Sequence, residues 1–185
     1  PPFQGGVAGM LGYGLNRTLE RILAMKHDDL QSPDYGMGIY DWVISFDHQQ
    51  NRAWLISTGY TVDGAFDERR AKDRARFVMD QIQKQGAYAT RLPGKQLPPI
   101  HQYPVPNHAG VTSNFSREQY IATVQRAIDY IHAGDVFQVN LAQRLLTPQT
   151  TDALTHYGKL RTVSPAPYAC YLDLGDFQLV SASPE

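Results

Sequence analysis

The sequence predicts an α+β fold, a mostly antiparallel sheet with helices packed on the outside, and three observations lead to it. Strand-like runs occur in pairs joined by short polar links, which is typical of antiparallel hairpins. Helical patterns do not alternate regularly with the strands, so no βαβ repeat is expected. The 185 residues, 42% hydrophobic and 19% charged, have the composition of a globular protein with one good core or two small lobes.

The first part of the chain, residues 1–86, is expected to combine strands with two helices. Residues 7–13 predict a strand, and residues 16–26 a short helix with apolar side chains at helical spacing. The β-rich runs 37–48 and 52–58 flank a short polar link and predict a hairpin. A charged helix follows at 67–85. Its basic residues alternate with acidic ones, which indicates a solvated face: Arg69, Arg70, Lys72, Arg74 and Arg76.

The middle part, residues 87–115, is rich in proline and is expected to be a partly extended connection. His101 and His108 lie in it. Their spacing matches no ordinary metal pattern, and no second cluster of cysteine or histidine accompanies them, so no zinc site is expected.

The last part, residues 116–185, begins with the clearest helix signal. Ser116 and Gln119 match a capping box, an apolar stripe follows, and Gly134 lies where a left-handed C-terminal cap is needed. A strand is expected over 136–145, a second helix over 151–162, and a rigid turn over 164–167. Strands 167–174 and 177–183 then predict a hairpin.

The predicted strand 136–145 has one largely apolar face and one polar face, which carries Gln138, Asn140 and Arg144. Buried polar groups need hydrogen-bond partners, so these side chains must bond either to protein or to a ligand. The pattern favours structural hydrogen bonds and leaves ligand binding as the alternative.

Composition and motifs exclude several classes of function. A net charge of -1 argues against a nucleic-acid binder, and no apolar run is long enough to span a bilayer. Phosphate-loop, nucleophile-elbow and EF-hand patterns are absent. The single cysteine, Cys170, lies in an apolar run, so a buried structural thiol and a reducing cytoplasmic location are expected.

The two ends of the sequence suggest a piece of a longer polypeptide, because there is no initiator methionine and a strand-like run stops abruptly at Glu185. Pro184 favours an extended Ser183, which places the Glu185 carboxylate at a strand end. Catalytic groups are commonly held at such positions. The alternative is a solvated terminal glutamate.

Three motifs, at residues 133–144, 164–168 and 181–185, resemble the chorismate-utilising enzymes. More narrowly, the chain resembles the branch that makes para-aminobenzoate, component I of aminodeoxychorismate synthase, and residues 3–6 and 38–42 fit the same subfamily. Asn140 and the run 166–169 favour this branch over the sister anthranilate synthases. The resemblance implies part of the fold of anthranilate synthase component I.

The resemblance also implies a reaction. Chorismate, bound with Mg²⁺, is aminated with loss of a ring hydroxyl, and the ammonia comes from a glutamine amidotransferase subunit. The position of Glu185 supplies the carboxyl that assists departure of the hydroxyl. The lysine nucleophile of this branch and the Mg²⁺ ligands correspond to positions downstream of Glu185, so no residue of this chain is assigned to the metal.

A second site follows from the resemblance alone. Pro165, Ala166, Pro167 and Tyr168 match a turn that forms part of a tryptophan pocket in the family. Two other functions stay open: anthranilate synthase component I, and a non-catalytic module that binds tryptophan or docks a subunit. We expect the 185 residues alone to bind ligands without turnover.

Overall fold

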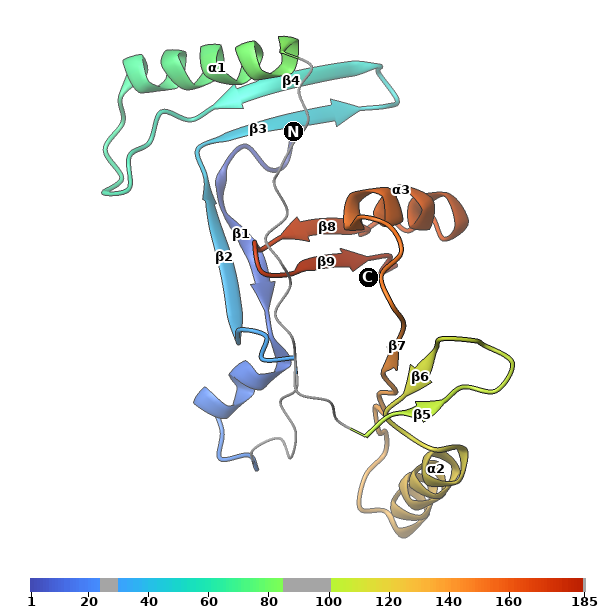
Figure 1. Cartoon of the computed structure of the whole chain (residues 1–185). Coiled ribbons are helices and arrows are strands. Elements are labelled where there is room, and N and C mark those ends of the chain that lie inside the picture. Colours follow the sequence, from blue (N-terminus) through green and yellow to red (C-terminus); the bar gives the residue numbers. More distant parts are fainter. Residues whose placement is uncertain (24–29, 85–100, 185) are drawn as a thin grey trace. The chain divides into compact units, whose positions relative to one another are not determined.

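The computed structural model describes residues 1–23, 30–84 and 101–184. In these residues it has four small antiparallel sheets with helices beside them, which confirms the predicted α+β class (Figure 1). The chain divides into two compact units. One comprises residues 1–24, 32–93 and 174–176, and the other comprises residues 25–31, 94–173 and 177–185.

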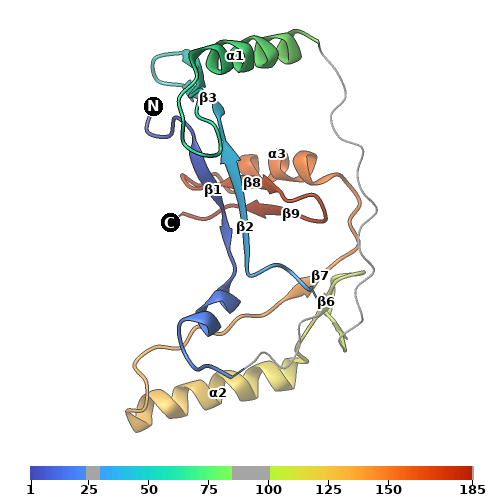
Figure 2. The same cartoon turned by 90° about the vertical axis from the view of Figure 1, so that its left-hand side faces the viewer.

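The first unit contains a two-stranded ribbon of β1 (Gly6–Leu11) and β2 (Tyr35–Tyr40), paired antiparallel over their full length (Figure 2). A 3₁₀ helix, η1 (Tyr13–Thr18), follows β1. The predicted α-helix over 16–26 is wrong in its described part, since regular structure ends at Thr18. Arg17 Nε and Thr18 Oγ1 donate to carbonyls three residues earlier, and these bonds compete with an α-helical ladder. Residues 24–26 lie outside the described residues.

The predicted long strand 37–48 is two strands, β2 and β3 (Trp42–Asp47), separated by Asp41. β3 pairs with β4 (Arg52–Ser57), so the predicted hairpin is confirmed. Asp47 Oδ1 accepts from the backbone N–H groups of Gln49 and Gln50 and closes the connecting turn. The break at Asp41 was not predicted, because a single polar residue between two strand-like apolar runs does not by itself indicate a strand end.

Helix α1 (Glu68–Gln83) contacts β4 and confirms the predicted charged helix. Asp67 is its N-cap and accepts from the backbone N–H groups of Arg69 and Arg70, which satisfies two donors of the first turn. Val78 is its one buried side chain, 3% exposed. The helix therefore meets the rest of the unit along a narrow stripe.

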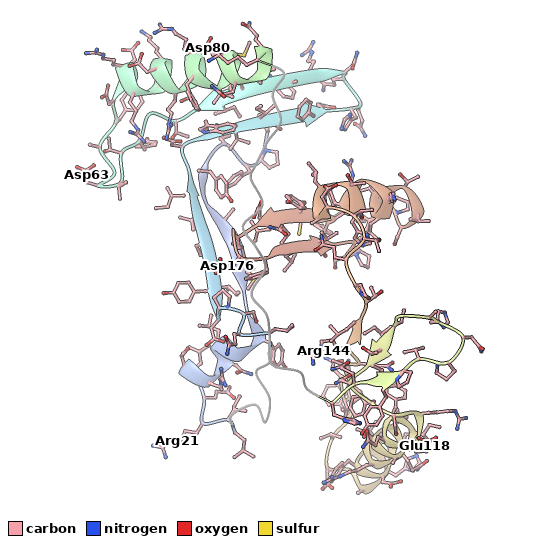
Figure 3. All side chains as sticks on the ribbon, in the orientation of Figure 1. Arg21, Asp63, Asp80, Glu118, Arg144 and Asp176 are labelled. Carbon is pink, nitrogen blue, oxygen red and sulfur yellow. The ribbon has the colours of Figure 1, made fainter. Side chains whose placement is uncertain are left out.

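The second unit begins with a three-stranded sheet in the order β5 (Tyr103–Pro104), β6 (Thr112–Ser113) and β7 (Leu145–Leu146). Helix α2 (Arg117–Ala133) follows β6, and Glu118 lies in its first turn (Figure 3). Both bonds of the capping box between Ser116 and Gln119 are present, and Gly134 is left-handed with φ 81°. The predictions for this helix are confirmed. In the described part of the chain, no helix is both long enough and apolar enough to cross a membrane.

The predicted strand over 136–145 is wrong, since residues 136–144 have no strand structure and only Leu145 belongs to β7. Phe137, predicted on the apolar face, is 92% exposed. A strand needs a partner along its length to satisfy its backbone groups. Within residues 101–184 the segment finds one only at its end, where Asn114 N–H donates to Arg144 O and Thr112 and Ser113 pair with β7.

Helix α3 (Ala153–Val163) is capped by Asp152, and it precedes the hairpin of β8 (Cys170–Asp173) and β9 (Gln178–Ser181). These predictions are confirmed. Cys170 is exposed, so the predicted buried thiol is wrong. Tyr171 lies with its ring 6.0 Å from that of Tyr157 on α3, and neighbouring strand residues point to opposite faces. Cys170 therefore faces away from the helix.

Candidate functional site

Two of the motifs that predict function meet at the open end of the β8–β9 hairpin. The ladder pairs Cys170 with Ser181, and beyond it the backbone N–H of Tyr168 donates to the carbonyl of Ser183 at 3.3 Å. The turn that contains Pro165 and Pro167 thus lies beside the segment that leads to Pro184. In the sequence these motifs begin seventeen residues apart, at 164 and 181, and the sequence alone did not predict this contact.

The turn is held in place by its neighbours. Ala169 N–H donates to Ala166 O at 3.2 Å and closes the turn. The hydroxyl of Tyr157 on α3 lies 3.4 Å from Ala169 O, within reach of a hydrogen bond. Tyr168 is 65% exposed, so its ring is available on the surface of this unit.

Glu185, the predicted catalytic residue, lies outside the described residues. The structure follows the chain to Pro184, past a strand β9 whose residues are all half-buried. The role of Glu185 therefore stays a prediction.

The polar residues of segment 136–145 separate into two groups. Gln138 and Asn140 are exposed. At the other end, Arg144 N–H donates to Asn114 Oδ1 at 2.8 Å, and Gln143 Nε2 donates to Oγ of Ser113 at 3.0 Å. Ser113 is only 3% exposed, so this bond satisfies a buried hydroxyl. Structural hydrogen bonding is thus found at the 143–144 end, with Gln143 coming from the face predicted to be apolar.

Each histidine of the proline-rich part has a local contact. The His101 ring meets the Tyr103 ring edge to face at 4.6 Å, and His108 Nδ1 lies 3.0 Å from the carbonyl of Pro106. Across residues 1–23, 30–84 and 101–184, no three histidine, cysteine, aspartate or glutamate side chains form a group that could hold a metal. The ligands of the Mg²⁺ that the resemblance implies are expected downstream of Glu185, so that metal stays a prediction.

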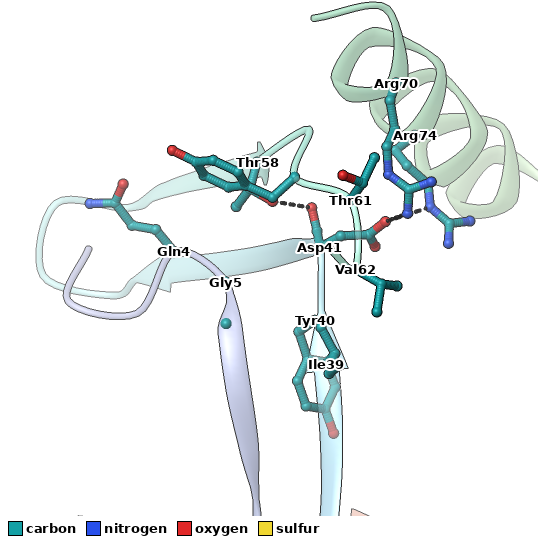
Figure 4. Close-up of a pocket in the computed structure, with 12 residues that line it drawn as sticks. Gln4, Gly5, Ile39, Tyr40, Asp41, Thr58, Thr61, Val62, Arg70 and Arg74 are labelled. Atoms are coloured by element: carbon teal, nitrogen blue, oxygen red, sulfur yellow. Dashed lines mark hydrogen bonds and ion pairs between the residues drawn. The ribbon is translucent and has the colours of Figure 1, made fainter. Parts of the chain in front are cut away.

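A feature that sequence reasoning missed lies in the first unit, at Asp41. Arg70 Nη2 and Arg74 Nε, one turn apart on α1, both donate to Asp41 Oδ2, at 2.7 and 3.0 Å (Figure 4). The Asp41 side chain is 15% exposed, whereas the two arginines are 37% and 43% exposed. The backbone carbonyl of Asp41 also accepts a hydrogen bond, from the backbone N–H of Thr58 at 2.9 Å.

Opposing effects act on the pKa of Asp41. Burial raises it, while the hydrogen bonds and charges of Arg74 and then Arg70 lower it by more, so the net pKa lies below the usual value. The predicted solvated face of α1 is therefore wrong for these two arginines. A signal was available, because residues 70, 74 and 78 recur at helical spacing and Val78 is the buried position.

The other basic residues of α1 behave as predicted. Arg69 and Arg76 pair with Asp73, and Lys72 pairs with Glu68, all within one helical turn and all well exposed. These pairs keep their charges in solvent and leave the two inward arginines as the functional candidates of this helix.

A pocket of about 570 Å³ opens beside the Asp41 pair, entirely within the first unit. Its wall combines the two arginines with apolar side chains and with the backbone at the start of β1. The lining residues are Gln4, Gly5, Gly6, Ile39, Tyr40, Asp41, Thr58, Tyr60, Thr61, Val62, Arg70 and Arg74.

Comparison with known proteins points to one family. Residues 1–185 match the family described as chorismate binding enzyme. The chain is 40% identical over 185 residues to anthranilate synthase component 1 of Thermus thermophilus, covering all of this chain and 36% of that protein. It is 32% and 31% identical to aminodeoxychorismate synthase component 1 of Bacillus subtilis and Escherichia coli, again over its whole length.

The chain spans 37% and 35% of the length of the latter two relatives. Among solved structures, it is similar to anthranilate synthase component I from Streptococcus pneumoniae, with a TM-score of 0.78 and 24% identity. That similarity covers all of this chain and 39% of the other, and it confirms the predicted fold.

Proposed function

The chain belongs to the family of chorismate-binding enzymes, and from this premise we propose that its full-length parent is component I of aminodeoxychorismate synthase. The parent aminates chorismate with ammonia from a glutamine amidotransferase subunit, for para-aminobenzoate and folate synthesis. The observation that carries the proposal is the family match over residues 1–185, together with relatives of this name at 31–32% identity. Asn140 and the run 166–169 support this branch.

In this proposal Glu185 is the general acid. Hydroxide is a poor leaving group, so a protonated carboxyl within hydrogen-bond reach of the departing ring hydroxyl lowers the barrier. Such an acid needs a raised pKa, which partial burial in a closed site provides. The bond between Tyr168 and Ser183 supports a defined position for the residues that precede Glu185.

Anthranilate synthase component I is the second candidate, because the Thermus thermophilus relative of that name is 40% identical to this chain. Its product differs in a way that decides between the two. Anthranilate forms with release of pyruvate, whereas aminodeoxychorismate keeps the enolpyruvyl group.

The test uses the full-length parent with chorismate, Mg²⁺ and ammonium, and identifies products by chromatography with mass detection. Aminodeoxychorismate is expected. Anthranilate with an equal amount of pyruvate would move the parent to the sister enzyme, and no aminated product from either route would overturn both.

Variants of the parent test the role of Glu185. Glu185→Gln is expected to lower kcat by at least about a hundredfold, the usual worth of a general acid, with little change in KM. Glu118→Gln is the matched control, since Glu118 is exposed in the first turn of α2. Equal activity of the two variants would remove Glu185 from the reaction.

The tryptophan pocket and the partner subunit are proposals of the same kind. We expect tryptophan to bind the parent and Tyr168→Ala to weaken that binding, measured by calorimetry. We also expect glutamine to replace ammonium only when the amidotransferase subunit is added. Turnover with glutamine by the parent alone would contradict the need for a partner.

A further inference from the structure

The pocket beside Asp41 contains hydrogen-bond donors that its own residues leave unused. A guanidinium carries five N–H donors, and Asp41 Oδ2 takes one from Arg70 and one from Arg74. The side chains of Arg70 and Arg74 are 37% and 43% exposed and both line the pocket, so a ligand can reach N–H groups that Asp41 does not take. A negatively charged acceptor at these groups would form charge-assisted hydrogen bonds.

The local charge favours an anion. Two guanidinium groups face one carboxylate, which leaves one net positive charge at the pocket wall. Asp67 and Asp73 lie on the other side of the arginines but are engaged elsewhere. Asp67 caps α1, and Asp73 pairs with two neighbouring basic residues of the same helix.

Much of the remaining wall is apolar and partly open, with Gln4, Thr58 and Thr61 as its polar members. Ile39, Tyr40, Tyr60 and Val62 line it, and Tyr60 and Val62 are 56% and 90% exposed. Figure 4 shows Val62 beside the Asp41–Arg74 pair. The volume of about 570 Å³ is within the range of about 300–1,000 Å³ that is common for small-molecule sites.

We propose that this pocket binds a free aromatic carboxylate, with the carboxylate on Arg70 and Arg74 and the ring against Tyr60 and Val62. The planar fork of arginine matches a carboxylate, and an aromatic ring gains contact area and ring-edge geometry beside tyrosine. The site lies wholly within the first unit and does not rest on the reaction proposed above.

The probe for the test is fluorophenylacetate, followed by fluorine NMR with the full-length parent, and the neutral amide of the same compound is its control. The acid is expected to bind at least about tenfold more tightly than the amide, because only the acid can take the arginine donors. Equal affinities, or no binding of the acid, would overturn the proposal. The second result would mean that a free carboxylate has no access to the pocket.

Val62→Glu and Val62→Gln locate the binding without touching the ion pair. The glutamate places a negative charge at the arginines, and the glutamine has nearly the same shape. Val62→Glu is expected to weaken the probe at least about fivefold relative to Val62→Gln through repulsion and competition. Equal binding by the two variants would place the probe elsewhere and overturn the assignment.

Arginine variants provide a second comparison on α1. Arg74→Gln is expected to weaken the probe about tenfold, whereas Arg69→Gln changes it less than twofold because Arg69 is 91% exposed and lies outside the pocket wall. Equal loss in both variants would indicate a general charge effect and contradict a built site.

Discussion

At the residue scale, Asp41 has two structural roles through different atoms. Its carbonyl accepts the N–H of Thr58, and its carboxylate accepts from Arg70 and Arg74. The first bond is made where β2 gives way to β3, and the second anchors α1. One polar residue in an apolar run therefore decides where the chain changes sheets.

The lowered pKa of Asp41 predicts a pH dependence of stability. Because the folded pKa lies below the unfolded value, the carboxylate contributes stability above about pH 4 and loses it as the pH falls through the folded pKa. Asp41→Asn should lower the free energy of unfolding by about 1 kcal/mol near pH 7, since the arginine partners are half-exposed. Urea unfolding at several pH values measures this difference.

The outcome at low pH is the control for that variant. The difference between wild type and Asp41→Asn should shrink as the pH falls from about 4 through the lowered folded pKa, because Asp41 is then protonated first in the unfolded state and afterwards in the folded state. A difference that stays constant with pH would show that the substitution acts through shape rather than charge.

Ser116 carries a second prediction at this scale. Its Oγ accepts from Gln119 N–H at 3.2 Å, and its own N–H donates to Gln119 Oε1 at 3.1 Å. Ser116→Ala removes the first bond and should cost about 1 kcal/mol of stability by thermal unfolding. Arg117→Ala, at the next and exposed position, should change it by less than about 0.5 kcal/mol. Equal effects would argue that the cap adds nothing.

At the element scale, the junction between β4 and α1 depends on a glycine. Gly59 has φ 70°, and a Cβ on it would lie 2.6 Å from Asp67 O and 2.9 Å from the Ala71 side chain. Gly64 also has positive φ, at 83°, but a Cβ there meets nothing within 4 Å. Substitution of Gly64 therefore tests backbone strain alone, whereas substitution of Gly59 tests strain together with steric crowding.

Gly59→Ala should therefore destabilise the protein by about 3 kcal/mol and Gly64→Ala by about 1 kcal/mol. The difference reports the close packing of β4 on the start of α1. Urea denaturation of both variants, compared with wild type, measures it. Similar losses in the two variants would mean that the helix start shifts freely to admit a methyl group.

Elements whose signals are local could be predicted from sequence. A few adjacent residues are enough to predict each of three features: the capping box of Ser116, the left-handed Gly134 and the β8–β9 turn at Gly175. The strand predicted over 136–145 failed, because alternation specifies two faces but supplies no neighbouring strand. Pattern alone cannot show whether a partner is present.

The candidate sites show the same division. The turn 165–168 and the segment 181–184 were found as motifs, but their contact through Tyr168 and Ser183 depends on hairpin register. Asp41 and the arginines of α1 are 29 and 33 residues apart in sequence. Their charges were visible, but no local rule joins them.

At the scale of the whole molecule, few side chains are buried. Within the described residues Val78 and Ser113 are the only buried side chains, each 3% exposed, while apolar side chains such as Leu11 and Phe137 are 65% and 92% exposed. Relatives of this chain are nearly three times as long. Much of the apolar surface of this chain is therefore left uncovered by the described residues.

The 185-residue chain by itself should consequently bind the dye ANS strongly and associate, as seen by light scattering, whereas the full-length parent should do neither. The chain unfolded in urea is the control for dye fluorescence. A monomeric chain that leaves the dye dark would contradict this prediction and indicate that the two units cover their apolar faces themselves.

The alignment of Tyr168 with Ser183 also has a genetic consequence. Deleting one residue from 170–173 or 178–180 would leave the sequence motifs at 164–168 and 181–185 intact in the gene. The deletion would nevertheless move their pairing by one position and turn the following side chains to the opposite face. Length changes should thus be tolerated in the turn at Gly175 and Asp176 and selected against within the strands. The number of residues between the two motifs should therefore be kept as closely as the motif residues themselves.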